Sequence, residues 1–177
     1  YLLHRPEKFF SHDAFNLFLN SLEHLDANQR QELQQYIESH LSEISNALRF
    51  LREINSESWH DQILEAKDDY ERLRLIDKHV HATYLRLIEG VLAPLCRLPA
   101  HFSRKNANKG TEGLDIHPIV EELKNSPLKA VTTCYEHTMR NGIGHGGITY
   151  LQDGIRYNDK KGNEETFDAT SIIRLCD

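Results

Sequence analysis

Arg140, Asn141 and His145 are the residues whose types and spacing are suited to chemistry. An imidazole gains and loses a proton near neutral pH, and a guanidinium keeps its charge and presents several N–H donors to a phosphate. Cleavage of RNA by its own 2′-hydroxyl requires both functions, a proton acceptor and a cation beside the charged phosphorane. The structural alternative is that Arg140 and His145 only pair with the last carbonyl groups of a helix.

Two residues just before Arg140 are secondary candidates that would support it. Glu136 precedes Arg140 by four residues, the acid-first order that favours an ion pair on a helix, and an ordinary surface pair is its favoured interpretation. His137 supplies a second imidazole. After residue 141, regular helix is disfavoured by four glycines, Gly142, Gly144, Gly146 and Gly147. We therefore expect the helix to fray there, so that the chain bends and Arg140 and His145 converge.

The segment Arg140-Asn141-Gly142-Ile143-Gly144-His145, followed by Gly146, resembles the hallmark of the HEPN superfamily (higher eukaryotes and prokaryotes nucleotide-binding). In that hallmark an Arg, often followed by a polar residue, precedes a His by a short interval. The resemblance covers roughly residues 12 to 147 and implies a helical bundle. It also implies a metal-independent endoribonuclease that leaves 2′,3′-cyclic phosphate ends, with Arg140, His145 and Asn141 as its catalytic residues.

The same resemblance implies the partners of the protein. RNA would be the substrate, and no cofactor is expected. The family usually brings two motifs together across a dimer, so one motif per chain implies a homodimer. A toxin–antitoxin or phage-defence setting, with an antitoxin or another regulatory protein as partner, is the expected context.

Two other functions remain open from the residues. The first is a non-catalytic HEPN-like module that binds RNA, a nucleotide or a protein partner. The second, a metal-dependent hydrolase, is poorly supported because the sequence contains no cluster of acidic and histidine residues at ligand spacing. His79 and His81 point in different directions on a helix and are expected to be a solvated or partly buried pair.

Composition places the chain among globular proteins. Its 177 residues suit one domain, and the formal net charge of −6 argues against a general nucleic-acid binder. Residues 94–161, however, hold 10 Lys and Arg against 7 Asp and Glu. Within them, Arg104, Lys105 and Lys109 lie in an expected polar loop over 101–112 and could contact phosphates, although an ordinary solvated loop is the favoured interpretation.

The cysteines and the most apolar region indicate the compartment. Cys96, Cys134 and Cys176 are odd in number and far apart, which fits a reducing cytoplasm rather than a disulfide framework. Residues 85–102 are too often interrupted by charges and prolines for a membrane span. No secretory signal pattern is visible, and the missing initiator Met leaves open that the chain is part of a longer protein.

The periodicity of apolar residues predicts a mainly helical fold with a small antiparallel sheet at its C-terminal end. A helix capped by Ser11 should run to Leu25, and residues 26–28 should connect it to a second helix that ends near Ile54. A third helical region is expected over 59–93, with an interruption near 77–81 and an end at Pro94 and Pro99. The expected apolar face of the second helix consists of Leu33, Ile37, Leu41, Ile44, Leu48 and Leu51.

The C-terminal part should position the motif. A brief helix over 118–124 precedes the motif helix, which should begin at Ser126-Pro127 and pack through Leu128, Val131, Tyr135 and Met139. A hairpin with an Asp153-Gly154 turn, a third strand over 164–167 and a final helix capped by Asp168 should follow. We therefore predict a helical bundle over 1–147 and an appendage over 148–177 packed on it.

Overall fold

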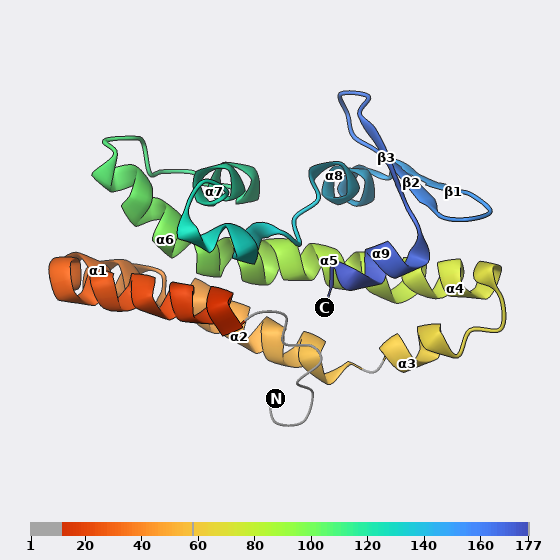
Figure 1. Cartoon of the computed structure of the whole chain (residues 1–177), viewed down its shortest axis with the longest axis horizontal. Helices are drawn as coiled ribbons and strands as arrows, with labels where there is room; N and C mark the ends of the chain where they lie inside the picture. Colours follow the sequence, from red (N-terminus) through yellow and green to blue (C-terminus); the bar gives the residue numbers. More distant parts are fainter. Residues whose placement is uncertain (1–11, 58, 177) are drawn as a thin grey trace. The chain divides into compact units, whose positions relative to one another are not determined.

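The computed structural model describes residues 12–57 and 59–176 of the chain (Figure 1). The predicted fold class, mainly helical with a small three-stranded antiparallel sheet near the C-terminus, is confirmed. The described chain groups into two compact units, one from residues 12–49 and 91–133, the other from residues 50–90 and 134–176. These limits differ from the predicted boundary at residue 147, because the motif helix and the strands fall in the same unit.

The first unit is helical. It contains α1 (His12–Ser39), the start of α2 (Leu41–Ser56), α6 (Ala93–Asn106), α7 (Ile116–Leu123) and the 3₁₀ helix η4 (Pro127–Thr132). The predicted connection between two helices at residues 26–28 is a kink one residue later, at Gln29, whose φ of −137° and ψ of 36° are not helical, and α1 continues beyond it to Ser39. The predicted cap at Ser11 lies outside the described residues. The core cluster combines α1 with α6 through Leu25, Leu33, Tyr36, Leu98 and Phe102.

The buried face of α1 and α2 differs from the predicted one. Ile37, Leu41 and Leu48 are 37%, 57% and 51% exposed, whereas Tyr36 and Ala47 are buried. Leu33 is buried as predicted, and Ile44 and Leu51 are partly buried, so three of the six predicted positions contribute to the packed face. The sequence pattern predicts one continuous helix here, but a turn at His40 separates α1 from α2. The apolar residues before and after this turn therefore do not follow a single helical repeat.

The predicted third helix consists of several segments. A short helix, α3 (Trp59–Leu64), comes first, and the chain is then helical without a break through α4 (Asp69–Leu75), η2 (Ile76–Val80), α5 (His81–Leu87), η3 (Ile88–Leu92) and α6. Both η2 and η3 are π-helical, and η2 matches the interruption expected near 77–81. The predicted end at Pro94 and Pro99 is wrong. Pro94 falls in the first turn of α6, where its missing N–H is tolerated, and the expected loop begins only after Asn106.

The second unit carries the sheet, which Figure 1 draws in blue beside α8 (His137–His145). The strands are β1 (Ile148–Tyr150), β2 (Ile155–Asn158) and β3 (Glu164–Phe167), in the order β1-β2-β3 and antiparallel throughout. Asp168 accepts a hydrogen bond from Ser171 N and caps α9 (Ala169–Arg174). The predicted hairpin, third strand and cap are therefore confirmed.

A chain of hydrogen bonds, buried at His81 and Tyr157 and exposed at Asp77 and Tyr150, joins η2 and α5 to this sheet. His81 Nε2 lies 2.7 Å from the hydroxyl of the fully buried Tyr157 on β2, and His81 Nδ1 lies 3.2 Å from Asp77 Oδ1. Tyr150 on β1 donates a short hydrogen bond to the same Asp77 oxygen. Burial lowers the pKa of His81, so the neutral ring is favoured. These contacts fix β1 and β2 against the helices that precede the motif.

Candidate functional site

The start of the motif helix is set by a tertiary contact. Ser126 does accept a hydrogen bond from Leu128 N, at 3.0 Å, but it caps only the 3₁₀ helix η4, and α8 begins later, at His137. The prediction of one helix from Ser126 is wrong, and its apolar stripe is divided between η4, a turn and α8. The buried Tyr84 explains the break, because its hydroxyl binds backbone groups of Cys134 and Glu136 at 3.2 and 2.8 Å.

The glycines of the motif do not end the helix where expected. The chain remains helical through Gly142 and Gly144 to His145, and Gly146 closes the helix with φ +74°, the left-handed conformation typical of this position. At Gly142 a Cβ atom would lie 2.9 Å from Tyr157 Cβ, so glycine is required for the close approach of β2. Packing on the sheet outweighs the helix penalty of glycine, about 1 kcal/mol.

Arg140 is held on two sides. Its Nε donates to Glu89 Oε1 at 2.8 Å, its Nη2 lies 2.6 Å from the same oxygen in an ion pair, and its Nη1 donates to Asn141 Oδ1 at 2.7 Å. The expected pair with Glu136 does not form. Burial and, secondly, the charge of Glu165 raise the pKa of the Glu136 carboxyl group. The guanidinium side chain remains 30% exposed, so a ligand can reach it.

Asn141 connects the guanidinium to an imidazole. Because Asn141 Oδ1 accepts from Arg140, its amide nitrogen faces His137 Nε2, at 2.9 Å. His137 Nε2 must then accept, which places the ring proton on Nδ1, 2.9 Å from the Tyr135 hydroxyl oxygen. His137 is therefore part of the polar cluster around Arg140, as its sequence position suggested.

His145 stands apart from this cluster. It is the exposed last residue of α8 and forms no hydrogen bond or ion pair with the described part of the chain. On a regular helix, residues five apart are separated by about 140°. The bend that was expected to bring Arg140 and His145 together is absent from α8. The two side chains therefore point in different directions from the same helix.

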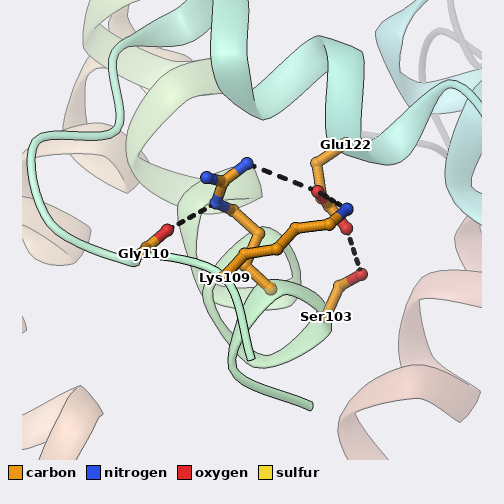
Figure 2. Close-up of polar contacts among 5 residues, drawn as sticks. Ser103, Lys109, Gly110 and Glu122 are labelled. Atoms are coloured by element: carbon orange, nitrogen blue, oxygen red, sulfur yellow. Dashed lines mark hydrogen bonds and ion pairs between the residues drawn. The ribbon is translucent and has the colours of Figure 1, made fainter. Parts of the chain in front are cut away.

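The three weaker RNA-binding candidates lie in the first unit and are already paired. Figure 2 shows the Glu122 carboxylate, 9% exposed, with Ser103 Oγ at 2.7 Å and Lys109 Nζ at 3.1 Å. Arg104 reaches the same carboxylate at 3.5 Å and donates to Gly110 O, while Lys105 binds Glu32 at 2.7 Å. The Ser103 bond and then the two cations lower the pKa of Glu122, which keeps it charged. These contacts anchor the loop.

Sequence reasoning missed Glu89. The partner of Arg140 comes from η3, 51 residues earlier, and no local spacing rule connects the two. The available signal was weak: Glu89 is a carboxylate within the most apolar region of the sequence, but its side chain is 51% exposed.

Within the described residues, no group of three or more His, Cys, Asp and Glu side chains could hold a metal ion. No helix among those residues is both long enough and apolar enough to cross a membrane. Comparison of the chain with protein-family models, with curated proteins and with solved structures finds no match.

Proposed function

We propose that the protein is a metal-independent endoribonuclease of the HEPN type. The observation that supports this proposal is the arrangement on α8, where a guanidinium fixed by Glu89 and Asn141 stays accessible and His145 is exposed at the helix end. A fixed cation and an unengaged imidazole are the two groups that RNA cleavage by the 2′-hydroxyl requires.

The reaction balances with these groups and water. The imidazole of His145 removes the proton of the 2′-hydroxyl, and the 2′-oxygen forms a bond to phosphorus. The bond from phosphorus to the 5′-oxygen breaks, the leaving oxygen takes a proton from water, and the hydroxide formed takes up the proton held by His145. Arg140 donates N–H groups to the non-bridging oxygens, where negative charge develops, and Asn141 keeps the guanidinium in place. The products are a 2′,3′-cyclic phosphate and a 5′-hydroxyl.

A homodimer would bring the guanidinium and the imidazole to one phosphate. Because α8 directs Arg140 and His145 about 140° apart, we propose that Arg140 of one protomer acts with His145 of the other. The proposed setting is a cytoplasmic toxin–antitoxin or defence system with a regulatory protein partner.

One observation favours a second candidate function, a non-catalytic module that binds RNA, a nucleotide or a protein. Arg140 already carries a carboxylate partner, and Arg104, Lys105 and Lys109 are paired as well. Such pairs reduce the positive field that a phosphate chain would meet.

The decisive experiment is cleavage of a labelled single-stranded RNA in excess EDTA. Wild type should cut it, whereas His145→Ala and Arg140→Ala should lose at least about 100-fold in rate. Arg140→Lys should rescue little, because the planar fork is lost. His24→Ala, an exposed histidine of the other unit, is the matched control and should cut normally.

Three results would contradict the proposal. Equal cleavage by wild type and His145→Ala means that the site is wrong, and activity only with added metal means that the reaction is wrong. RNA that is bound but never cut supports the non-catalytic module. A DNA strand of the same sequence should stay intact, since it lacks the 2′-hydroxyl.

A further inference from the structure

We infer that Glu89 is a positioning residue of this site, which orients the Arg140 guanidinium so that its remaining donors face a phosphate. The inference rests on the proposed function. It starts from the geometry of the pair: Glu89 Oε1 accepts a hydrogen bond from Nε at 2.8 Å and lies 2.6 Å from Nη2 in an ion pair. Contacts of one carboxylate with both nitrogens of one edge restrict the position and the plane of the guanidinium.

Counting the N–H groups of the Arg140 guanidinium shows which of them remain free to bind a ligand. A guanidinium has five N–H groups. Glu89 accepts the Nε–H group and forms an ion pair on the Nη2 side, and Asn141 accepts one N–H group of Nη1. One N–H therefore remains on each terminal nitrogen, and two donors from one plane are what a bidentate contact to a phosphate uses. Glu89 and Asn141 occupy the donors that would otherwise let the group turn.

The backbone that carries Glu89 is itself fixed. Glu89 lies in η3, and π-helical segments are frequent at functional sites. At the next residue, Gly90, a Cβ atom would approach the Phe50 ring to 2.9 Å, so this part of η3 packs closely on that ring. Tyr84, one turn earlier on α5, holds the backbone that leads into α8. The elements on both sides of the Glu89–Arg140 pair are thus anchored within one unit.

Two roles of Glu89, orienting the guanidinium and strengthening RNA binding, predict different effects on kcat and KM. Its negative charge lies beside the cation and disfavours an incoming phosphate, so it cannot help by strengthening RNA binding. An interaction that matters only in the transition state lowers kcat when it is removed and leaves KM unchanged. We therefore expect variants of Glu89 to lose kcat, with KM unchanged or lower.

The experiment compares steady-state cleavage of the labelled RNA, in EDTA, by four proteins. Glu89→Gln keeps an oxygen acceptor but loses the charge, and its kcat should fall about 10-fold. Glu89→Ala removes both, and its kcat should fall about 100-fold, the scale of a misplaced catalytic group. The matched control is Glu53→Gln, which breaks another glutamate–arginine pair of the same unit, that with Arg86, and should leave kcat unchanged.

A second measurement does not depend on cleavage. The Nε–H proton of Arg140, followed by ¹⁵N NMR, should exchange slowly with solvent in wild type and rapidly in Glu89→Ala. Equal unfolding temperatures of wild type and Glu89→Gln exclude a folding defect, and Glu89→Asp, with a charge but a shorter reach, should recover only part of kcat.

The outcomes separate this inference from the proposed function. If wild type cuts RNA and Arg140→Ala does not, but Glu89→Gln resembles Glu53→Gln or changes only KM, the inference is overturned and the function stands. Rapid exchange of the Arg140 Nε–H in wild type also overturns it. If wild type does not cut RNA at all, both fall.

Discussion

Glu89 and Glu136 show why spacing alone does not identify the partner of Arg140. Glu136 stands four residues before Arg140, but it is the N-cap of α8 with φ −109° and ψ 111°. The rule that pairs residues four apart holds only when both side chains leave a helix surface. Because the start of α8 is fixed by the Tyr84 hydroxyl, the rule fails at this position and Glu89 takes the contact.

Glu136→Gln is expected to stabilise the protein at neutral pH. Burial and the charge of Glu165 raise the pKa of Glu136 above about 4.5, so the folded chain holds this proton more tightly than the unfolded chain. That contribution is present below pH 4.5 and lost as the pH rises through the folded value. Thermal unfolding at pH 7 should give a Tm about 1–3 °C higher for the variant, and the difference should disappear at pH 4.

Glu65→Gln is the control for this prediction, since Glu65 is an exposed glutamate of the same unit. Its Tm should equal that of wild type at both pH values. A gain in both variants, or a gain for Glu136→Gln that persists at pH 4, would mean that the charge of Glu136 is not the cause.

The elements whose bounds depend on neighbouring residues could be predicted from sequence. The elements whose bounds depend on contacts with residues far away in the sequence could not. The alternation of β1 and β2, the Asp153-Gly154 turn and the cap at Asp168 lie within a few residues of the structure they determine. The start of α8 depends on Tyr84, 52 residues from Glu136, and its course through Gly142 depends on contact with β2. The motif residues of the candidate site were therefore found from sequence, but their contacts and directions were not.

The two glycines inside the motif should respond in opposite ways to alanine. A Cβ at Gly142 would meet Tyr157 Cβ at 2.9 Å and Gly147 O at 3.1 Å, so Gly142→Ala should destabilise by about 1–3 kcal/mol. A Cβ at Gly144 would meet nothing within 4 Å, so Gly144→Ala should stabilise by up to about 1 kcal/mol. Chemical denaturation of both variants checks this, and a loss of stability in Gly144→Ala would show that α8 is not helical there.

At the scale of the whole molecule, one chain carries both Arg140 and His145, but the two side chains do not come together within that chain. Arg140 is fixed on one side of α8, and His145 leaves the helix about 140° away. In the first unit, large apolar side chains also remain exposed on α1 and α2, among them Phe15, Leu41 and Leu48. Single exposed apolar side chains are common on protein surfaces. The separation of Arg140 and His145 on α8 is therefore the feature that motivates the proposed assembly of two copies.

Mixing two inactive variants tests whether the site is shared between protomers. If Arg140 of one chain acts with His145 of the other, a heterodimer of Arg140→Ala and His145→Ala contains one site with both residues intact and one with neither. Random exchange at equal amounts gives about half heterodimers, so about a quarter of the wild-type activity should return. Each variant alone should stay inactive at the same total concentration.

The mixture separates three arrangements. No recovery after exchange means that Arg140 and His145 act within one chain, where α8 would have to bend. A monomer in sedimentation at micromolar concentration rules out any shared site. Recovery that rises with total protein and is lost on dilution below the dimer dissociation constant is the behaviour that a site built across two protomers requires, because only the assembled pair holds the cation and the imidazole at one phosphate.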